Sequence, residues 1–193
     1  MSEVKTNKIS PSAGTTLTLG DAGDTITTAG TAVGFGISSA SQWRLQADFT
    51  GDAQPMGGGT GTIAVVNTDG YGSLGSAMTY ASGIFTFPST GHWLCLGQFS
   101  FITTLNGGAA GYIEYTANNG GAWTTASRSE DGSNYGFRSN MNIYHMMNIT
   151  DIANQKVRWS VEEDPAGTGG GTVTTTKGDA AITETGFTFI RLA

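Results

Sequence analysis

Short stretches in which apolar and polar residues alternate, separated by Gly- and Asn-rich turns, run from Trp43 to the end of the chain. In one of them, Val157, Trp159 and Val161 alternate with Lys, Arg and Ser. A two-residue period is typical of a β-strand that buries one face, and no stretch follows the 3.6-residue period of an amphipathic helix. We therefore predict about nine strands, at residues 42–49, 62–66, 83–87, 93–104, 111–116, 121–125, 140–149, 156–162 and 186–192.

The turns between these strands indicate the fold class. Asn119-Gly120 and Asn106-Gly107 each present the Asn-Gly pair that tolerates the positive φ angles of a type I′ turn, so a hairpin is predicted at both places. Many short strands with frequent turns are typical of antiparallel sandwiches and jelly rolls. The sequence thus predicts an all-β fold, an antiparallel jelly-roll sandwich.

The composition limits how much core one copy of the chain can form. Hydrophobic residues make up 38% of the 193 residues, but another 30 residues are Gly, which bring no side chain to a core. The length suits one domain with a short extension. A core this thin makes packing against other copies of the chain favourable, and large aromatic rings are expected to fill most of it.

The charge and the hydropathy exclude two classes of partner. The formal net charge is −6, and charged residues make up 12% of the chain, about half of the ~25% of an ordinary globular protein. Sparse Lys and Arg make nucleic acid a poor partner, because neutralising phosphates dominates that affinity. Residues 1–8 show no apolar segment typical of a secretory signal, and no run approaches the ~18 apolar residues of a membrane span. We expect no nucleic-acid partner, no membrane insertion and folding in the cytoplasm.

Residues with catalytic or metal-binding chemistry are few and scattered. The single Cys95 excludes an intrachain disulfide and a cysteine-based zinc cluster. His92 and His145 are isolated in sequence, and His145 shares a predicted strand face with Met141 and Met147, which is typical of a partly buried His. We expect no enzymatic activity, no cofactor and no metal. A depolymerase would need two scattered acids to meet in space.

Residues 1–40 differ from the rest of the chain. Thr alternates with Leu17, Leu19 and Ile26 in short stretches that end at Gly, and aromatic residues are absent before Phe35. Such a segment cannot bury its own apolar face. It is either a disordered tail or a stalk built by several chains, and the regular Gly spacing and low charge favour the stalk. We predict an N-terminal β-rich stem at 1–40 and a head at 41–193.

Residues 82–96, Ser-Gly-Ile-Phe-Thr-Phe-Pro-Ser-Thr-Gly-His-Trp-Leu-Cys-Leu, resemble a hallmark of the trimeric jelly-roll heads of the complement and tumour-necrosis-factor superfamily. Residues 151–159 and 186–192 are similar to the family's late strands, although the polar stretch 126–139 and the loop 167–172 depart from its pattern. The resemblance covers roughly residues 42–193 and implies a homotrimer. The candidates for its interface or core are Phe85, Phe87, Trp93, Trp159, Phe187 and Phe189.

Residues 5–26 resemble the N-terminal segment of tailed-phage structural proteins, in which a Gly- and Thr-rich stem precedes a jelly-roll head. The two resemblances together imply a non-enzymatic virion surface protein, a homotrimeric capsid decoration protein or head fibre assembled in the host cytoplasm. They imply that residues 1–40 attach to major capsid or tail proteins, with Leu17, Leu19 and Ile26 as the contact candidates.

A tail-fibre-type receptor-binding module is the alternative. It shares the fold but recognises a host-surface glycan through exposed loops. The candidate contact residues are Asn119, Trp123, Asn134 and Tyr135.

Overall fold

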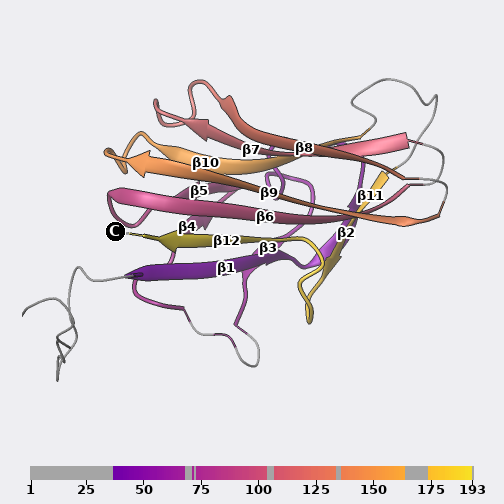
Figure 1. Cartoon of the computed structure of the whole chain (residues 1–193), viewed down its shortest axis with the longest axis horizontal. Helices are drawn as coiled ribbons and strands as arrows, with labels where there is room; N and C mark the ends of the chain where they lie inside the picture. The colour runs from indigo at the N-terminus through magenta and orange to yellow at the C-terminus, as the bar shows by residue number, and fades with distance from the viewer. Residues whose placement is uncertain are drawn as a thin grey trace, which may run out of the picture. The chain divides into compact units, whose positions relative to one another are not determined.

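The computed structural model describes residues 37–67, 71, 73–103, 107–133, 136–163 and 174–192. Within these residues the chain forms strands joined by turns and loops, without a helix (Figure 1). The described part therefore contains no helix that could cross a membrane. The strands are β1 (Ser39–Leu45), β2 (Ala47–Thr50), β3 (Ile63–Val65), β4 (Thr79–Ala81), β5 (Ile84–Thr86), β6 (Gly91–Thr103), β7 (Gly107–Thr116), β8 (Thr124–Ser133), β9 (Arg138–Ile149), β10 (Lys156–Glu163), β11 (Thr174–Asp179) and β12 (Gly186–Arg191).

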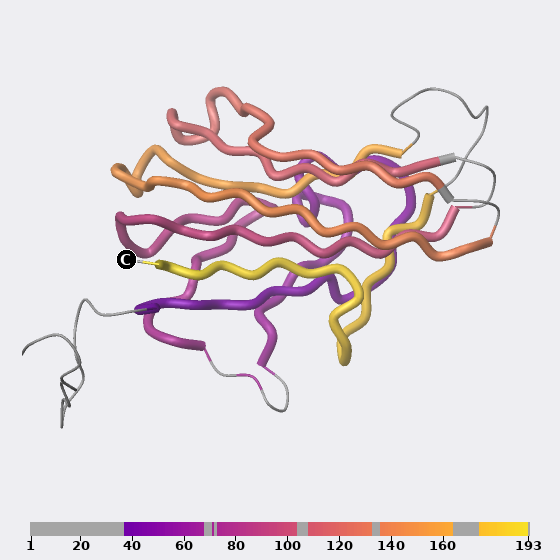
Figure 2. Tube along the Cα trace, viewed as in Figure 1, coloured from indigo at the N-terminus to yellow at the C-terminus, as the bar shows by residue number. Residues whose placement is uncertain are grey.

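The strands form two antiparallel sheets. In the first, sheet A, the long strand β6 pairs with β9 along one edge, and with β12 and then β11 along the other (Figure 2). Strands β1 and β3 extend sheet A beyond β12, and β2 extends it beyond β11. The second, sheet B, has the order β4-β5-β10-β7-β8. The predicted all-β, antiparallel sandwich is confirmed.

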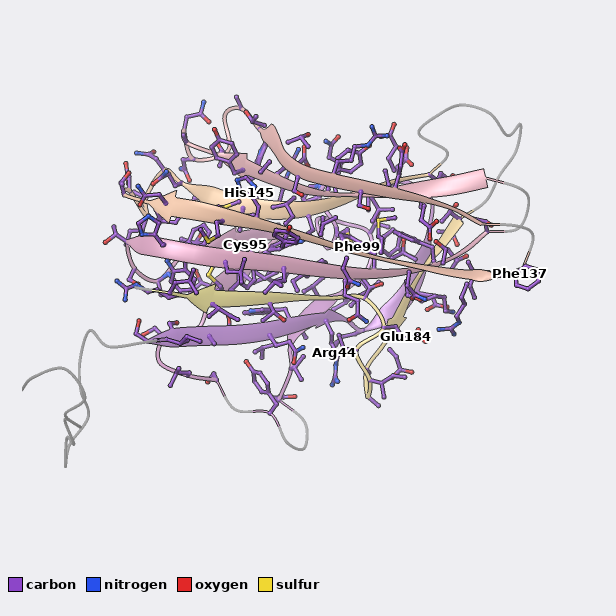
Figure 3. All side chains as sticks on the ribbon, in the orientation of Figure 1. Arg44, Cys95, Phe99, Phe137, His145 and Glu184 are labelled. Carbon is purple, nitrogen blue, oxygen red and sulfur yellow. The ribbon has the colours of Figure 1, made fainter. Side chains whose placement is uncertain are left out.

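Aromatic side chains from both sheets fill the space between them. The Trp159 ring of β10 lies 4.5 Å from the Phe187 ring and 4.9 Å from the Phe189 ring of β12, measured between centroids. Phe85 of β5 meets Trp159 edge-on at 5.3 Å. Such offset and edge-to-face pairs add to the apolar area that the rings bury. Cys95 and Phe99 of β6 also lie in this layer (Figure 3).

Two glycines inside strands make room for these rings. A Cβ on Gly97 would lie 2.6 Å from Nε1 of Trp159, and a Cβ on Gly111 would lie 2.9 Å from the Phe99 ring. Both distances are too short for a side chain. Part of the high Gly content therefore lets large rings pack between the sheets.

Three strands of the structure were not expected from the sequence. Strand β4 is only three residues long, and β11 reads Thr-Thr-Thr-Lys-Gly-Asp, without an apolar residue. Strand β8 occupies most of the polar stretch expected to depart from the fold, and its residues 124–132 are half-buried or exposed. Alternation of apolar and polar residues identifies a strand only when one face of the strand is apolar. These three strands are too short or too polar to show that alternation.

Two predicted strands are divided or displaced in the structure, while the others differ from it only at their ends. The stretch 42–49 breaks at Gln46 into β1 and β2, which pair with different neighbours. The strand predicted at 121–125 is correct only at residues 124 and 125, which begin β8, because residues 117–123 form the turn before it.

One of the two predicted hairpins is confirmed. Asn119 and Gly120 have φ angles of 55° and 91°, and the Gly121 N–H donates to the Asn118 carbonyl at 3.2 Å, which closes the β7–β8 turn. Asn106 of the second predicted hairpin lies outside the described residues, but the strands on either side of it do not form a hairpin, because β6 belongs to sheet A and β7 to sheet B. A turn sequence sets where the chain reverses, and the pairing partners are set by the packing of the sheets.

The predicted stem lies almost entirely outside the described residues, which begin at Ile37. Leu17, Leu19 and Ile26 are therefore not placed, and the boundary between residues 40 and 41 stays a prediction.

Candidate functional site

The outer face of sheet A carries exposed apolar side chains. Leu94 of β6 pairs with Met146 of β9 on one side and with Ile190 of β12 on the other, and Leu96 pairs with Tyr144 in the next row. All five side chains point away from the core, because the strand residues between them face inward. Tyr144 is 71% exposed and Met146 59% exposed. We call Leu94, Leu96, Tyr144, Met146 and Ile190 the apolar face.

A groove of about 290 Å³ crosses the apolar face beside Tyr144. The amides of Gln42, Gln98 and Asn142 line it, together with Leu96 and Thr residues, and no charged side chain is among the described residues that form it. Gly186 also lines the groove, and a Cβ there would lie 2.4 Å from the Thr183 Cγ2, so Thr183 packs directly over this glycine. The surface can therefore bury apolar area and form amide hydrogen bonds without desolvating a charge.

Three further apolar side chains are exposed at one end of sheet A. Ile37, Leu74 and Leu192 are 52%, 47% and 36% exposed. Backbone hydrogen bonds join Leu74 to Ala40 of β1, and the Leu192 N–H donates to the His92 carbonyl at 2.8 Å. Figure 1 shows that β1 begins and β12 ends at this same end of the sheet. Exposed apolar side chains that gather on one part of a surface are typical of an interaction site, so this end of sheet A is a candidate for one.

The outer face of sheet B is charged. Glu114 of β7 and Arg158 of β10 are cross-strand neighbours, with the Arg158 Nε 2.9 Å from the Glu114 Oε2 and its Nη2 3.3 Å from Oε1. The Ser160 hydroxyl also donates to Oε2, and the Gln54 Nε2 donates to Oε1 at 3.0 Å. Glu114 is only 5% exposed, so these donors replace the water that its carboxylate loses.

Trp123 covers the other side of Arg158. The centre of the guanidinium lies 4.3 Å from the centroid of the Trp123 ring, a cation–π contact. Trp123 is half-buried in the β7–β8 turn, while Asn119 is exposed at the tip of the same turn. The Asn119 N–H donates to the Asn154 carbonyl at 2.9 Å. Because its ring contacts Arg158 of β10, Trp123 packs against sheet B.

A polar hollow of about 230 Å³ lies beside Glu114 on this face. Its wall includes Tyr112, whose hydroxyl donates to the Glu162 carboxylate. Partial burial, followed by the hydrogen bond to Glu162 and its charge, raises the pKa of Tyr112 to about 12. The lining residues are Asp52, Gln54, Tyr112, Glu114, Thr125, Ser160, Val161 and Glu162.

The residues predicted for the interface or the core lie in the core. Each is at most 1% exposed, so none offers surface to a neighbouring subunit in this structure. These residues are Phe85, Phe87, Trp93, Trp159, Phe187 and Phe189. Of the predicted receptor contacts, Asn119 and Trp123 lie together in one turn, while Asn134 and Tyr135 lie outside the described residues.

The sequence reasoning missed the apolar face and the Glu114–Arg158 pair. The apolar face did have a pattern: along the outward positions of β9, Tyr144 and Met146 interrupt a series of Asn residues. The pairing of Glu114 with Arg158 depends on the register of β7 and β10, which alternation alone does not give.

In the part of the chain that the structure describes, no group of three or more His, Cys, Asp or Glu could hold a metal ion. Cys95 is fully buried, which raises the pKa of its thiol, and its Sγ lies 4.0 Å from the Met147 Sδ. His145 is half-buried on the inward face of β9, as predicted, and His92 is exposed.

Comparison with known proteins defines the class by its fold. No protein-family model matches the chain, and a search of curated proteins found no relative. The chain is similar to the structure of Eiger TNF from S. frugiperda, with a TM-score of 0.57 and 11% identity over 80% of this chain and 92% of that one. It is similar to murine APRIL at pH 5.0, with a TM-score of 0.56 and 10% identity over 80% of this chain and 98% of that one. The chain has a TNF-like jelly-roll fold.

Proposed function

We propose that the chain is a non-enzymatic homotrimeric surface protein of a phage virion, a capsid decoration protein or head fibre. The apolar face of sheet A carries the assembly part of this proposal. In one subunit Tyr144 and Met146 are exposed and the other three side chains are half-buried, and all five would be buried between subunits.

Three observations favour a second copy of the chain as the partner on this face. Tyr144 and Met146 leave more than half of their surface exposed, and removing that surface from water is favourable. The groove beside them is lined without a charged residue, so a neighbouring subunit desolvates no ion there. The TNF-like jelly roll, together with the sequence resemblance to trimeric heads, favours a closed ring of three subunits.

The virion part of the proposal is supported by the resemblance of residues 5–26 to phage structural proteins. In this account residues 1–40 attach to major capsid or tail proteins, through Leu17, Leu19 and Ile26. The trimer assembles in the host cytoplasm and presents the charged outer faces of sheet B to the surroundings.

Sedimentation velocity tests the assembly. We expect the wild-type chain to sediment at about 60 kDa, three times its 19.9 kDa. The double variant Tyr144→Lys/Met146→Lys should sediment as a monomer, because it places two charges on the apolar face. The matched control Thr79→Lys/Ala81→Lys changes two exposed positions on β4 of sheet B and should stay trimeric. A wild-type monomer, or a trimeric Tyr144→Lys/Met146→Lys variant, contradicts the proposal.

Mass spectrometry of gradient-purified phage particles tests the virion part. The proposal expects peptides of this chain in the particles, at a copy number divisible by three. If the chain stays in the soluble fraction and is absent from the particles, the virion role is wrong even when the trimer forms.

The receptor-binding alternative shares the fold and the trimer. The hollow on the outer face of sheet B favours it, because a ligand site on that face stays accessible when sheet A is covered.

A further inference from the structure

The geometry points to a glycan-binding site in the polar hollow on the outer face of sheet B, with one neutral sugar unit held between Asp52, Tyr112, Thr125 and Glu162. The inference extends the receptor-binding alternative and does not depend on the homotrimer, because one subunit supplies every lining residue. The site proposed here lies on the face of sheet B, whereas the sequence placed the receptor contacts in loops.

Strands and a hydrogen-bonded segment, rather than loops alone, form the walls of the hollow. Its floor comes from β7 and β10, and the segment after β2 closes one side. Ala53 exchanges two backbone hydrogen bonds with Val161, each 2.9 Å long. The Asp52 Oδ1 accepts the Glu163 N–H at 2.8 Å, so the segment is tied to β10 at two neighbouring residues. A site that is ordered before binding loses less entropy when the ligand arrives.

The buried Glu114 fixes the polar groups of the floor. Four donor groups of Arg158, Ser160 and Gln54 hold its carboxylate. A buried ion pair contributes little stability relative to a well-packed apolar pair. The ion pair on this outer face is better explained by the group that Glu114 positions. Glu114 holds the Gln54 amide by its NH₂ group, which leaves the Gln54 Oε1 free to accept a hydrogen bond from a ligand.

The chemistry of the lining matches a polyol. Asp52 and Glu162 supply carboxylate oxygens, and a sugar hydroxyl that donates to a carboxylate forms a short, charge-assisted hydrogen bond. The Thr125 hydroxyl both donates and accepts, and the Tyr112 side chain forms a wall. The mixture of acceptors with hydroxyl groups suits a ligand whose own hydroxyls do both.

The size of the hollow and its hydrogen-bonding groups favour a neutral sugar, and spermidine and Ca²⁺ are the competing ligands that its carboxylates could bind. Its volume of about 230 Å³ is below the ~300–1,000 Å³ of pockets for drug-sized ligands, which suits a single sugar ring. Arg158 compensates the charge of Glu114, while Arg128, which lies 5.5 Å from the centre of the Tyr112 ring, pairs with Glu130. The described residues offer no group of three acids, His or Cys that could hold a metal ion.

Saturation-transfer NMR on the full-length protein tests the site. The probes are the methyl glycosides of glucose, galactose, rhamnose and N-acetylglucosamine, with spermidine and Ca²⁺ in separate samples. We expect at least one glycoside to bind at millimolar concentration, and Glu162→Gln to weaken that binding at least tenfold. The matched control Glu130→Gln changes an exposed acid on β8 outside the hollow and should bind as the wild type does.

The outcomes separate this inference from the homotrimer. The Tyr144→Lys/Met146→Lys variant should keep the single-site affinity even as a monomer, because it does not touch the hollow. The inference is overturned if none of the four glycosides binds, if Glu162→Gln and Glu130→Gln bind equally well, or if only spermidine or Ca²⁺ binds. Equal urea midpoints for the wild type and Glu162→Gln establish that a loss of binding is not a loss of folding.

Discussion

Removing the Glu114 carboxylate should destabilise the protein far more than removing an exposed acid on the same face. In Glu114→Ala the Arg158 guanidinium keeps its charge but loses its only carboxylate partner among the described residues. Its side chain is 13% exposed, and the Glu114 side chain is 7% exposed. Breaking a buried pair from one side costs about 3–5 kcal/mol. Because Trp123 still contacts Arg158, we expect the lower end, a loss of about 3 kcal/mol.

The matched control is the exposed pair between Arg128 and Glu130, whose side chains are 45% and 57% exposed. Exposed pairs contribute about 0.2–1 kcal/mol, so Glu130→Ala should lose less than about 1 kcal/mol. The double variant Glu114→Leu/Arg158→Leu should recover most of the loss of Glu114→Ala, because an apolar pair leaves no buried charge unpaired.

Urea unfolding followed by Trp fluorescence measures these differences, at one protein concentration so that assembly contributes equally. The interpretation of Glu114 as a buried, fully held carboxylate is refuted if Glu114→Ala loses no more stability than Glu130→Ala. It is also refuted if the double variant is less stable than Glu114→Ala.

Three further predictions concern the core and the charged face. Gly111→Ala should lose about 1–3 kcal/mol in urea unfolding, because its Cβ would lie 2.9 Å from the Phe99 ring; a neutral result would mean that the ring moves aside. Phe85→Ala should lose about 3–5 kcal/mol by the same assay, since Phe85 is fully buried against Trp43 and Trp159, and a loss under about 1 kcal/mol would contradict a packed core. The raised pKa of Tyr112, about 12, means that its neutral hydroxyl stabilises the fold fully below the ordinary Tyr pKa of ~10 and ceases to do so as the pH rises through about 12. The gap in urea midpoint between the wild type and Tyr112→Phe should therefore close between pH 10 and 12, and a gap that stays constant would count against the Tyr112–Glu162 bond.

The sequence predicted the parts of the fold in which one side of a strand is apolar. Strand β10 is the clearest case, because Val157, Trp159 and Val161 are buried while the residues between them face outward or bind Glu114. The same alternation identified β9 and β12. Strand β8 was missed because both of its faces are polar, so its place in sheet B depends on backbone pairing with β7 and not on burial.

The functional surfaces could be predicted less well, for a reason of the same kind. The aromatic residues chosen for an interface were the most apolar ones, and the fold places the most apolar residues between its sheets. The interface candidates are instead moderately apolar side chains at outward positions, such as Tyr144 and Met146. The hollow joins Asp52 to Glu162, and residues this far apart in sequence meet only when the pairing of the strands is known.

In the proposed assembly, sheet A's apolar face holds three copies of the chain together. Multi-angle light scattering of the purified full-length chain, across a dilution series, measures this most directly. The account predicts about 60 kDa, three times 19.9 kDa, at every concentration above the dissociation range, and a shift to the monomer mass in Tyr144→Lys/Met146→Lys. A wild-type mass of 19.9 kDa throughout the series would contradict it.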